Sequence, residues 1–211
     1  MASWTDRTVT NEHLLPYVDS KSAPEEVAKG FKTLPFERNI FKLLANSPTF
    51  FPVFMKMLST CWSPDRTLRS SDWQLIVLRT AATLDAPYEF DVNEPVARVF
   101  GFTDAHIHAL KDAQQPLPEE LFTKRQLLLA RMVEQLNGPQ NRVDAEILKA
   151  AQGVFGDTGV VEVFYINGVY GFLARFMNSA RVDFDEPIAG LDDMLKTYNA
   201  AAIEKEKTYR D

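Results

Sequence analysis

Residues 68–101 read LRSSDWQLIVLRTAATLDAPYEFDVNEPVARVFG, and they carry most of the information about the fold. Over 72–84 the apolar residues recur every three or four positions, as they do on one face of a helix. The breaker at 85–87 (DAP) ends this helix, and a second helix is predicted over 88–100. Pro95 is expected to kink this second helix or to end its first half. The segment therefore predicts two consecutive helices.

The rest of the chain shows the same helical spacing, and no stretch alternates like a strand. Further helices are predicted over 36–45, 49–62, 104–112, 119–136, 144–155 and 158–181. The last of these is apolar almost all round, which favours a central position or a contact with another subunit. The sequence thus predicts an all-α protein. It has an N-terminal arm over 1–35 with at most a short helix near 24–31, a helical domain over 36–190, and a solvated helical tail over 191–211.

Composition restricts the function further. The chain has 211 residues, of which 45% are hydrophobic and 25% charged, as in an ordinary soluble globular protein. A net charge of -6 without a Lys/Arg cluster argues against a nucleic-acid partner. No run of 18 apolar residues and no apolar leader is present in the sequence, so we expect a cytoplasmic protein with no membrane partner.

The sequence offers little for thiol or metal chemistry. Cys61 is the single cysteine, so the chain can form no internal disulfide and no thiol pair, and we expect it to be a buried small hydrophobe. His106 and His108 lie two residues apart, which places them on different helix faces, and we expect both to be exposed. His13 lies in the polar arm. We therefore predict no metal site and no cofactor.

Three segments, 73–79 (WQLIVLR), 88–90 (YEF) and 97–101 (ARVFG), are similar to motifs of one known family. They resemble the "REL-x-I-L-R-V-A" helix, the "YEW-x-x-H" or "C-x-x-C" segment and the "AR-x-x-G" ending of the carboxymuconolactone decarboxylase and alkylhydroperoxidase-D-like family. The resemblance covers about residues 36–182. It implies an oligomeric helical bundle, a homo-oligomer of two, three or six copies.

The departures from the family pattern are informative. The thiol positions of the peroxidase branch fall on Ala86 and Glu89, its histidine on Asn93, and its relay glutamate on Gln74. Because a thiolate is the nucleophile that hydroperoxide chemistry requires, the resemblance implies neither peroxidase nor disulfide-reductase activity. The decarboxylase branch places glutamate and histidine four residues apart, and here these positions hold Glu89 and Asn93. An amide can hold an enol or carboxyl oxygen but cannot shuttle a proton, so the acid/base work falls to Glu89.

Glu89 is the predicted catalytic acid/base. Its neighbours Tyr88, Phe90 and Trp73 should desolvate it and raise its pKa toward the useful range. The predicted substrate-binding residues are Trp73, Gln74, Tyr88, Phe90 and Tyr170, the last at the family's aromatic position facing the pocket.

Structural alternatives stay open for several of these carboxylates. Glu89 could instead cap Asn93 or pair with Arg79 or Arg98. Glu162, on the apolar helix 158–181, could pair with an arginine such as Arg175, lie at a subunit contact, or line a pocket. We expect Asp91 at the surface and Tyr165 in the core.

The sequence thus favours a cofactor-free lyase or isomerase/cyclase acting on a small, largely apolar organic acid, lactone or polyketide-like metabolite. Decarboxylation, double-bond isomerisation and ring closure have the same requirements. Each needs a carboxyl acid/base, a group that hydrogen-bonds the developing negative charge, and the exclusion of water. Fifteen Phe, three Trp and six Tyr residues make an apolar cavity easy to build. The alternative is a non-catalytic ligand-binding or assembly protein on the same scaffold.

Overall fold

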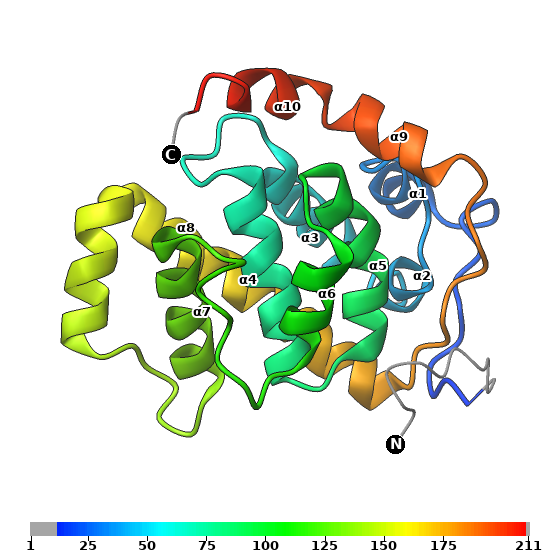
Figure 1. The fold of residues 1–211 in the computed structure, drawn as a ribbon. Helices are drawn as coiled ribbons and strands as arrows, with labels where there is room; N and C mark the ends of the chain where they lie inside the picture. The colour runs from blue at the N-terminus through cyan, green and yellow to red at the C-terminus, as the bar shows by residue number, and fades with distance from the viewer. Residues whose placement is uncertain (1–11, 210–211) are drawn as a thin grey trace.

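The computed structural model describes residues 12–209, and every regular element in that range is a helix (Figure 1). In chain order the elements are α1 (Glu25–Phe31), α2 (Asn39–Leu44), α3 (Phe51–Ser59), the short 3₁₀ helix η1 (Thr60–Trp62), α4 (Ser70–Thr83), α5 (Pro87–Val99), α6 (Asp104–Lys111), α7 (Lys124–Asn137), α8 (Ala145–Ala180), α9 (Leu191–Tyr198) and α10 (Ala200–Glu206). The all-α prediction is confirmed.

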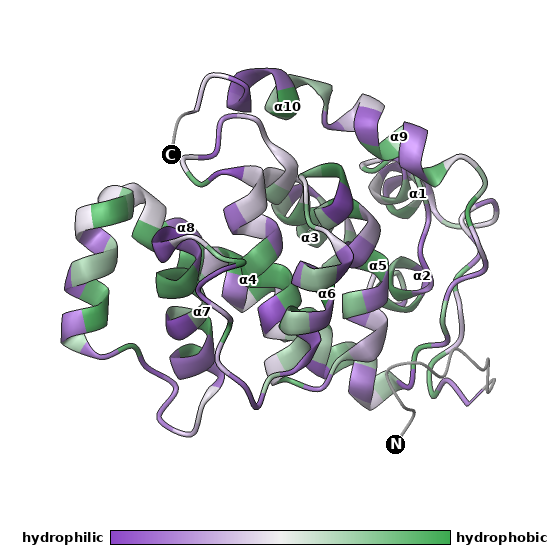
Figure 2. Ribbon diagram, in the orientation of Figure 1, coloured by the Kyte–Doolittle hydropathy of each residue, from purple (hydrophilic) through white to green (hydrophobic). Residues whose placement is uncertain are grey.

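Helix α4 is the centre of the fold. Twelve of its fourteen residues are buried, and it packs against α5, α6, α7 and α8. Figure 1 shows α4 in the middle of the molecule, between α7 on one side and α5 and α6 on the other. Trp73, Ile76 and Leu78 have no exposed surface, and each buried side chain of this size stabilises the fold by about 1.5–3 kcal/mol. Figure 2 shows hydrophobic residues along the middle of α4, where the helix lies inside the molecule.

Helix α5 follows α4 after a tight turn and runs through Pro95 without ending. Of the two alternatives predicted for Pro95, a kink or an end to the first half of the helix, the second is wrong. A proline removes one backbone donor, but Val96 and Ala97, which come directly after it, are fully buried and hold the second half of the helix against the core. The turn is closed by a hydrogen bond of 2.8 Å from the Ala86 N–H to the Ala81 carbonyl. Helices α4 and α5 therefore form an antiparallel pair whose register is fixed at this contact.

Helix α8 consists of two helical segments joined at Gly156, where φ is 67° and ψ is 176°. This conformation is open almost only to glycine, and it falls between the two helices predicted over 144–155 and 158–181. By length and composition α8 could cross a membrane, but 56% of its most apolar window is buried inside the fold. With the break at Gly156, these features are those of a core helix.

Helix α7 begins at Lys124, five residues after the predicted start at Glu119. Thr123 caps the helix: the Gln126 N–H donates to its hydroxyl at 3.3 Å, and the Thr123 N–H donates to the Gln126 side-chain oxygen at 3.0 Å. This reciprocal capping box satisfies two N–H groups that a helix start leaves free. The pattern T-x-x-Q at 123–126 was the signal for the true boundary.

The C-terminal tail is two helices laid against the body, not one solvated helix. Figure 1 shows α9 and α10 running along one edge of the molecule, from the side of α1 to the start of α4. Leu195 and Ala202 are buried, at 0% and 3% exposed. The prediction missed an apolar stripe of Leu191, Leu195, Tyr198 and Ala202, whose spacing matches one face of a helix.

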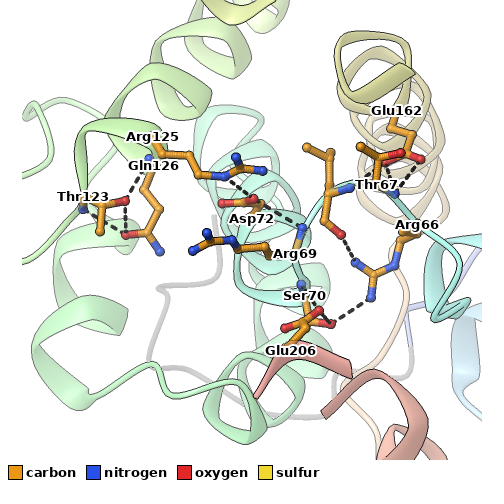
Figure 3. Close-up of polar contacts among 11 residues, drawn as sticks. Arg66, Thr67, Arg69, Ser70, Asp72, Thr123, Arg125, Gln126, Glu162 and Glu206 are labelled. Atoms are coloured by element: carbon orange, nitrogen blue, oxygen red, sulfur yellow. Dashed lines mark hydrogen bonds and ion pairs between the residues drawn. The ribbon is translucent and has the colours of Figure 1, made fainter. Parts of the chain in front are cut away.

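Two carboxylates from distant helices hold the N-terminus of α4 (Figure 3). Glu162 of α8 accepts hydrogen bonds from the N–H groups of Thr67 and Leu68, at 2.9 and 2.8 Å. Glu206 of α10 accepts from both the N–H and the hydroxyl of Ser70, each at 2.7 Å. Negative charge is favourable at a helix N-terminus, where backbone N–H groups have no partner within the helix. The central helix is thus tied to α8 and to the tail.

The N-terminal arm wraps the body, as far as the structure describes it; the predicted residues 1–11 of the arm lie outside the described range. The Leu14 N–H donates to the Ala180 carbonyl at 3.0 Å, and the Val18 N–H donates to the Lys42 carbonyl at 3.1 Å. The short helix expected near 24–31 is α1.

Candidate functional site

A small pocket lies between the segment that carries α2, helix α5 and the second half of α8. Its volume is about 40 Å³, room for about three water molecules, so a larger molecule enters only as lining side chains move. Fourteen residues line it: Leu34, Phe36, Arg38, Ile40, Phe41, Leu58, Trp62, Glu89, Val92, Asn93, Val96, Tyr170, Leu173 and Met177. Three of these, Glu89, Asn93 and Tyr170, are predicted site residues. The rest of the lining is almost entirely apolar.

Glu89 lies in the first turn of α5 with no exposed surface. Neither of its carboxyl oxygens makes a hydrogen bond with any described residue. Burial raises the pKa of this carboxyl well above its usual value of 4.5, because a charged group loses its hydration in an apolar site. Buried carboxyl groups without a partner are rare in folded proteins, so Glu89 is the most unusual polar group in the pocket.

The two arginines that the sequence offered as partners of Glu89 pair elsewhere. Arg79 makes an ion pair of 2.6 Å with Glu134, and Arg98 makes ion pairs of 2.8 Å with both Glu94 and Asp104. The alternative in which Glu89 pairs with Arg79 or Arg98 is therefore wrong. The sequence could not distinguish these partners, because the carboxylates that pair with the two arginines come from three elements: Glu134 from α7, Glu94 from α5 and Asp104 from α6.

Asn93 lies one turn after Glu89 on the same face of α5 and is 6% exposed. Its side-chain N–H donates to the backbone carbonyl of Glu89 at 2.8 Å. One amide proton is thus bound within the helix. The other amide donor and the carbonyl oxygen remain the atoms with which Asn93 could hold a bound molecule.

Tyr170 of α8 completes the polar side of the pocket. It is 3% exposed. Burial raises the pKa of its phenol well above 10, and the nearby Cys61 and Glu89 raise it further. The hydroxyl therefore stays protonated in the physiological range and can donate a hydrogen bond.

Trp73 and Gln74 of α4 do not line the pocket. The ring of Trp73 packs edge-on at 4.9 Å against that of Trp62, which does line it. Both amide atoms of Gln74 are buried and make no hydrogen bond with the described residues. Gln74 and Asn93 each lie seven residues from the Ala81–Ala86 contact of the antiparallel pair, so they lie at the same level of α4 and α5.

Tyr88 and Phe90 lie outside the pocket, although both were predicted to bind substrate. The Tyr88 hydroxyl donates to Asp185 at 2.8 Å and accepts from the Ile40 N–H at 3.4 Å. Phe90 lies under the ammonium group of Lys111, 5.2 Å from its ring centre. Residues directly before and after Glu89 point about 100° away from it around the helix axis, which takes both rings to other neighbours.

Sequence reasoning missed Arg38 and Trp62 among the lining residues. Arg38 is 7% exposed, donates to Asp185 at 3.3 Å and lies over the ring of Phe36 at 5.3 Å. Both missed residues come from segments far from α5 in the chain. The sequence carries no local signal that α2 and η1 would close over Glu89.

Glu162 and His106 have other partners than expected. Glu162 caps the N-terminus of α4, while Arg175 donates to the Gly171 carbonyl at 2.9 Å. His106 is only partly exposed: its ring contacts the Thr103 hydroxyl at 2.7 Å and the Leu121 carbonyl at 2.9 Å. The alternative of an arginine partner for Glu162 and the expectation of an exposed His106 are therefore wrong. The alternative that Glu162 lines a pocket is confirmed, since it lines a second pocket with Cys61, Arg66 and Tyr165.

Cys61 is buried, as expected, at 1% exposed. Burial raises the pKa of its thiol to about 12. No cluster of three or more metal-ligating side chains occurs between residues 12 and 209.

Comparison with known proteins points to one fold. No family model matches the chain, and no curated protein matches it. Among solved structures, the debrominase Bmp8 in complex with 2,3,4-tribromopyrrole is 14% identical, with a TM-score of 0.68 over 90% of this chain and 100% of that one. An alkylhydroperoxidase AhpD core, an uncharacterised peroxidase-related protein from Ralstonia eutropha JMP134, is 16% identical, with a TM-score of 0.68 over 89% of this chain and 97% of that one. At these identities the likeness is one of fold, and the protein has the all-helical AhpD-like fold that its sequence motifs implied.

Proposed function

We propose that this protein is a cofactor-free enzyme that moves protons on a small, largely apolar molecule, as a lyase or an isomerase/cyclase. The observation that carries the proposal is Glu89: a carboxyl with no exposed surface, lining an apolar pocket, whose oxygens make no hydrogen bond with the described residues. Buried groups with strongly shifted pKa values cluster at functional sites. The position of Glu89 beside a cavity supports such a role over a structural one.

The chemistry follows from the protonation state of Glu89. Since burial raises its pKa well above 4.5, the carboxyl begins as an acid. It can give its proton to a carbon or oxygen of the bound molecule, and the carboxylate that results can take a proton from another atom of the same molecule. Asn93 and Tyr170 line the same pocket and can hold an oxygen on which charge develops. One such acid/base contributes about 10²- to 10⁴-fold in rate.

Two findings bear on the class of reaction. The debrominase of the same fold binds a brominated pyrrole, which supports a small ring as the kind of molecule this scaffold can hold. Thiol chemistry is disfavoured here, because the single cysteine is buried and its pKa is raised to about 12, so little thiolate forms. We therefore propose proton transfer rather than peroxide reduction.

The experiment compares wild type with Glu89→Gln. Each protein is incubated in deuterium oxide with unsaturated lactones and polyketide-like carbonyl compounds, and proton NMR follows product formation and deuterium uptake. We expect wild type to incorporate deuterium at the reacting carbon and Glu89→Gln to lose at least 100-fold in rate. Glu94→Gln is the matched control, since Glu94 lies on the same helix but pairs with Arg98. Equal rates in wild type and Glu89→Gln would rule out the role proposed for Glu89.

The alternative, a non-catalytic ligand-binding or assembly protein, is favoured by one observation. Asn93 donates one of its amide protons to its own helix, which leaves it fewer atoms with which to hold a reacting molecule. Ligand binding by wild type without turnover or deuterium exchange would support this alternative.

A further inference from the structure

The charges around the pocket bear on which molecules it can hold. Arg38 is the single cation among the fourteen lining residues, and Asp185 neutralises it. Asp185 is itself held by the Tyr88 hydroxyl at 2.8 Å and by the Asn39 N–H at 2.7 Å. The side chains of Arg38 and Asp185 are each only 8% exposed. A buried pair of this kind resists separation, because freeing Arg38 leaves the Asp185 charge buried and without its counter-ion.

The other polar groups that line the pocket are uncharged or acidic. Asn93 and Tyr170 are neutral donors and acceptors, and Glu89 is a carboxyl whose oxygens have no partner among the described residues. A carboxylate bound here would lose its hydration without gaining a free cation, and it would face a group that can itself become negative. Burial of an uncompensated charge is among the most costly events in a protein interior. A neutral carbonyl oxygen instead accepts a hydrogen bond from the protonated carboxyl of Glu89.

We propose that the pocket binds neutral carbonyl compounds, such as ketones and lactones, and rejects their free carboxylate counterparts. This inference narrows the substrate class of the proposed function. It rests on that function, which places the substrate beside Glu89. It disfavours decarboxylation of a free acid, since that substrate enters as an anion. Isomerisation or ring closure of an uncharged molecule fits the charges of the lining.

The test uses two probes of nearly the same shape, acetophenone and benzoate. Acetophenone has a methyl group where benzoate has a charged oxygen. Calorimetric titration of the full chain measures both affinities at about pH 8, and quenching of Trp62 and Trp73 fluorescence gives a second signal. We expect acetophenone to bind at least 100-fold more tightly than benzoate. Because only the acid form of benzoate fits, its affinity should fall about tenfold for each unit of rising pH.

Two variants identify the groups responsible. Asp185→Asn keeps a side-chain oxygen for the Asn39 N–H but removes the charge that neutralises Arg38. We expect it to raise benzoate affinity at least tenfold and to leave acetophenone binding unchanged. Glu89→Leu removes the carboxyl donor and should weaken acetophenone binding about tenfold, whereas Glu89→Gln retains an N–H donor and should not.

The outcomes separate this inference from the proposed function. Benzoate binding as tightly as acetophenone in wild type would overturn the inference even if Glu89 proved catalytic. Failure of acetophenone to bind at its solubility limit would overturn it as well. Selective binding of acetophenone without any turnover or deuterium exchange would leave the inference standing and remove the proposed function.

Discussion

Glu89 should make stability depend on pH. Its pKa in the folded protein lies well above 4.5, so folding takes up a proton at any pH between the ordinary value and the raised one. The stability that the neutral carboxyl contributes is complete below about 4.5 and is lost as pH rises through the folded-state pKa. As pH rises above about 5, and until it passes the raised pKa of Glu89, we expect the free energy of unfolding of Glu89→Gln to increase relative to wild type, by up to about 1.4 kcal/mol per pH unit.

Urea unfolding at a series of pH values measures this difference. Glu94→Gln is the control on the same helix, because the Glu94 carboxylate is partly exposed and pairs with Arg98. Parallel curves for wild type and Glu89→Gln would contradict the burial of an unpartnered carboxyl.

Local spacing predicted part of the site. Two residues four apart on a helix share a face, and Glu89 and Asn93 do line one pocket. Tyr88 and Phe90 were placed by adjacency in the chain, which on a helix turns a side chain away rather than toward its neighbour. Arg38 reaches the pocket only through long-range packing, which spacing along the sequence cannot reveal.

At the scale of elements, the break in α8 depends on one residue. Gly156 has φ 67° and ψ 176°, and a Cβ there would meet nothing within 4 Å. The cost of a side chain at this position is thus one of backbone conformation alone. We expect Gly156→Ala to lower the free energy of unfolding by about 1–3 kcal/mol, measured by urea denaturation.

Gly153→Ala is the matched control. Gly153 lies three residues earlier in α8, and a Cβ there also meets nothing within 4 Å. With ordinary helical geometry, alanine at this position should stabilise by about 0.5–1 kcal/mol. If both variants shifted stability in the same direction, the account of the break would fail.

The tail is held by Glu206, whose carboxylate accepts two hydrogen bonds of 2.7 Å from Ser70. We expect Glu206→Gln to destabilise the protein by about 1–2 kcal/mol in thermal or urea unfolding, since hydrogen bonds to a charged group and the favourable end of the α4 dipole are weakened. Glu204→Gln, which affects only an exposed pair with Lys207, should change stability by less than about 0.5 kcal/mol. Equal effects would show that Glu206 does not hold the tail.

Helix boundaries were predictable where a proline or a glycine interrupts the helical pattern. The breaks at 85–87 and at Gly156 were both expected. The start of α7 was missed because the capping box at Thr123 was not recognised. The docked tail was missed because charged residues interrupt the apolar stripe through Leu195. Whether an amphipathic helix docks depends on the surface opposite it, which lies elsewhere in the sequence.

At the scale of the whole molecule, one apolar face stays exposed where α3 meets α8. Phe50 and Val53 are 73% and 67% exposed, and the ring of Phe54 lies 5.4 Å from that of Phe172, which joins the two helices. Val161 is 65% exposed and lies eleven residues, about three turns, before Phe172 on the same side of α8. Exposed apolar side chains that gather on one face mark interaction sites. We propose that a second copy of the chain covers this face, in keeping with the homo-oligomer expected from the sequence.

Sedimentation velocity tests this proposal. Val53→Glu places a charge on this face, at a residue that is 67% exposed, and should weaken self-association at least tenfold. Val154→Glu adds the same charge at an exposed valine of α8 on the other side of the break at Gly156, and it should leave association unchanged. A monomeric wild type at high concentration would contradict the proposal.

The pKa of Glu89 in solution is the most direct test of whether this fold keeps a movable proton inside its pocket. Carbon-13 NMR of protein labelled at the glutamate carboxyl carbons follows each titration, and the signal that disappears in Glu89→Gln assigns the residue. We expect its midpoint well above the usual value of 4.5, because the carboxyl is buried. A midpoint for Glu89 at or below that of the exposed glutamates would contradict the acid/base role and the selectivity for neutral molecules together.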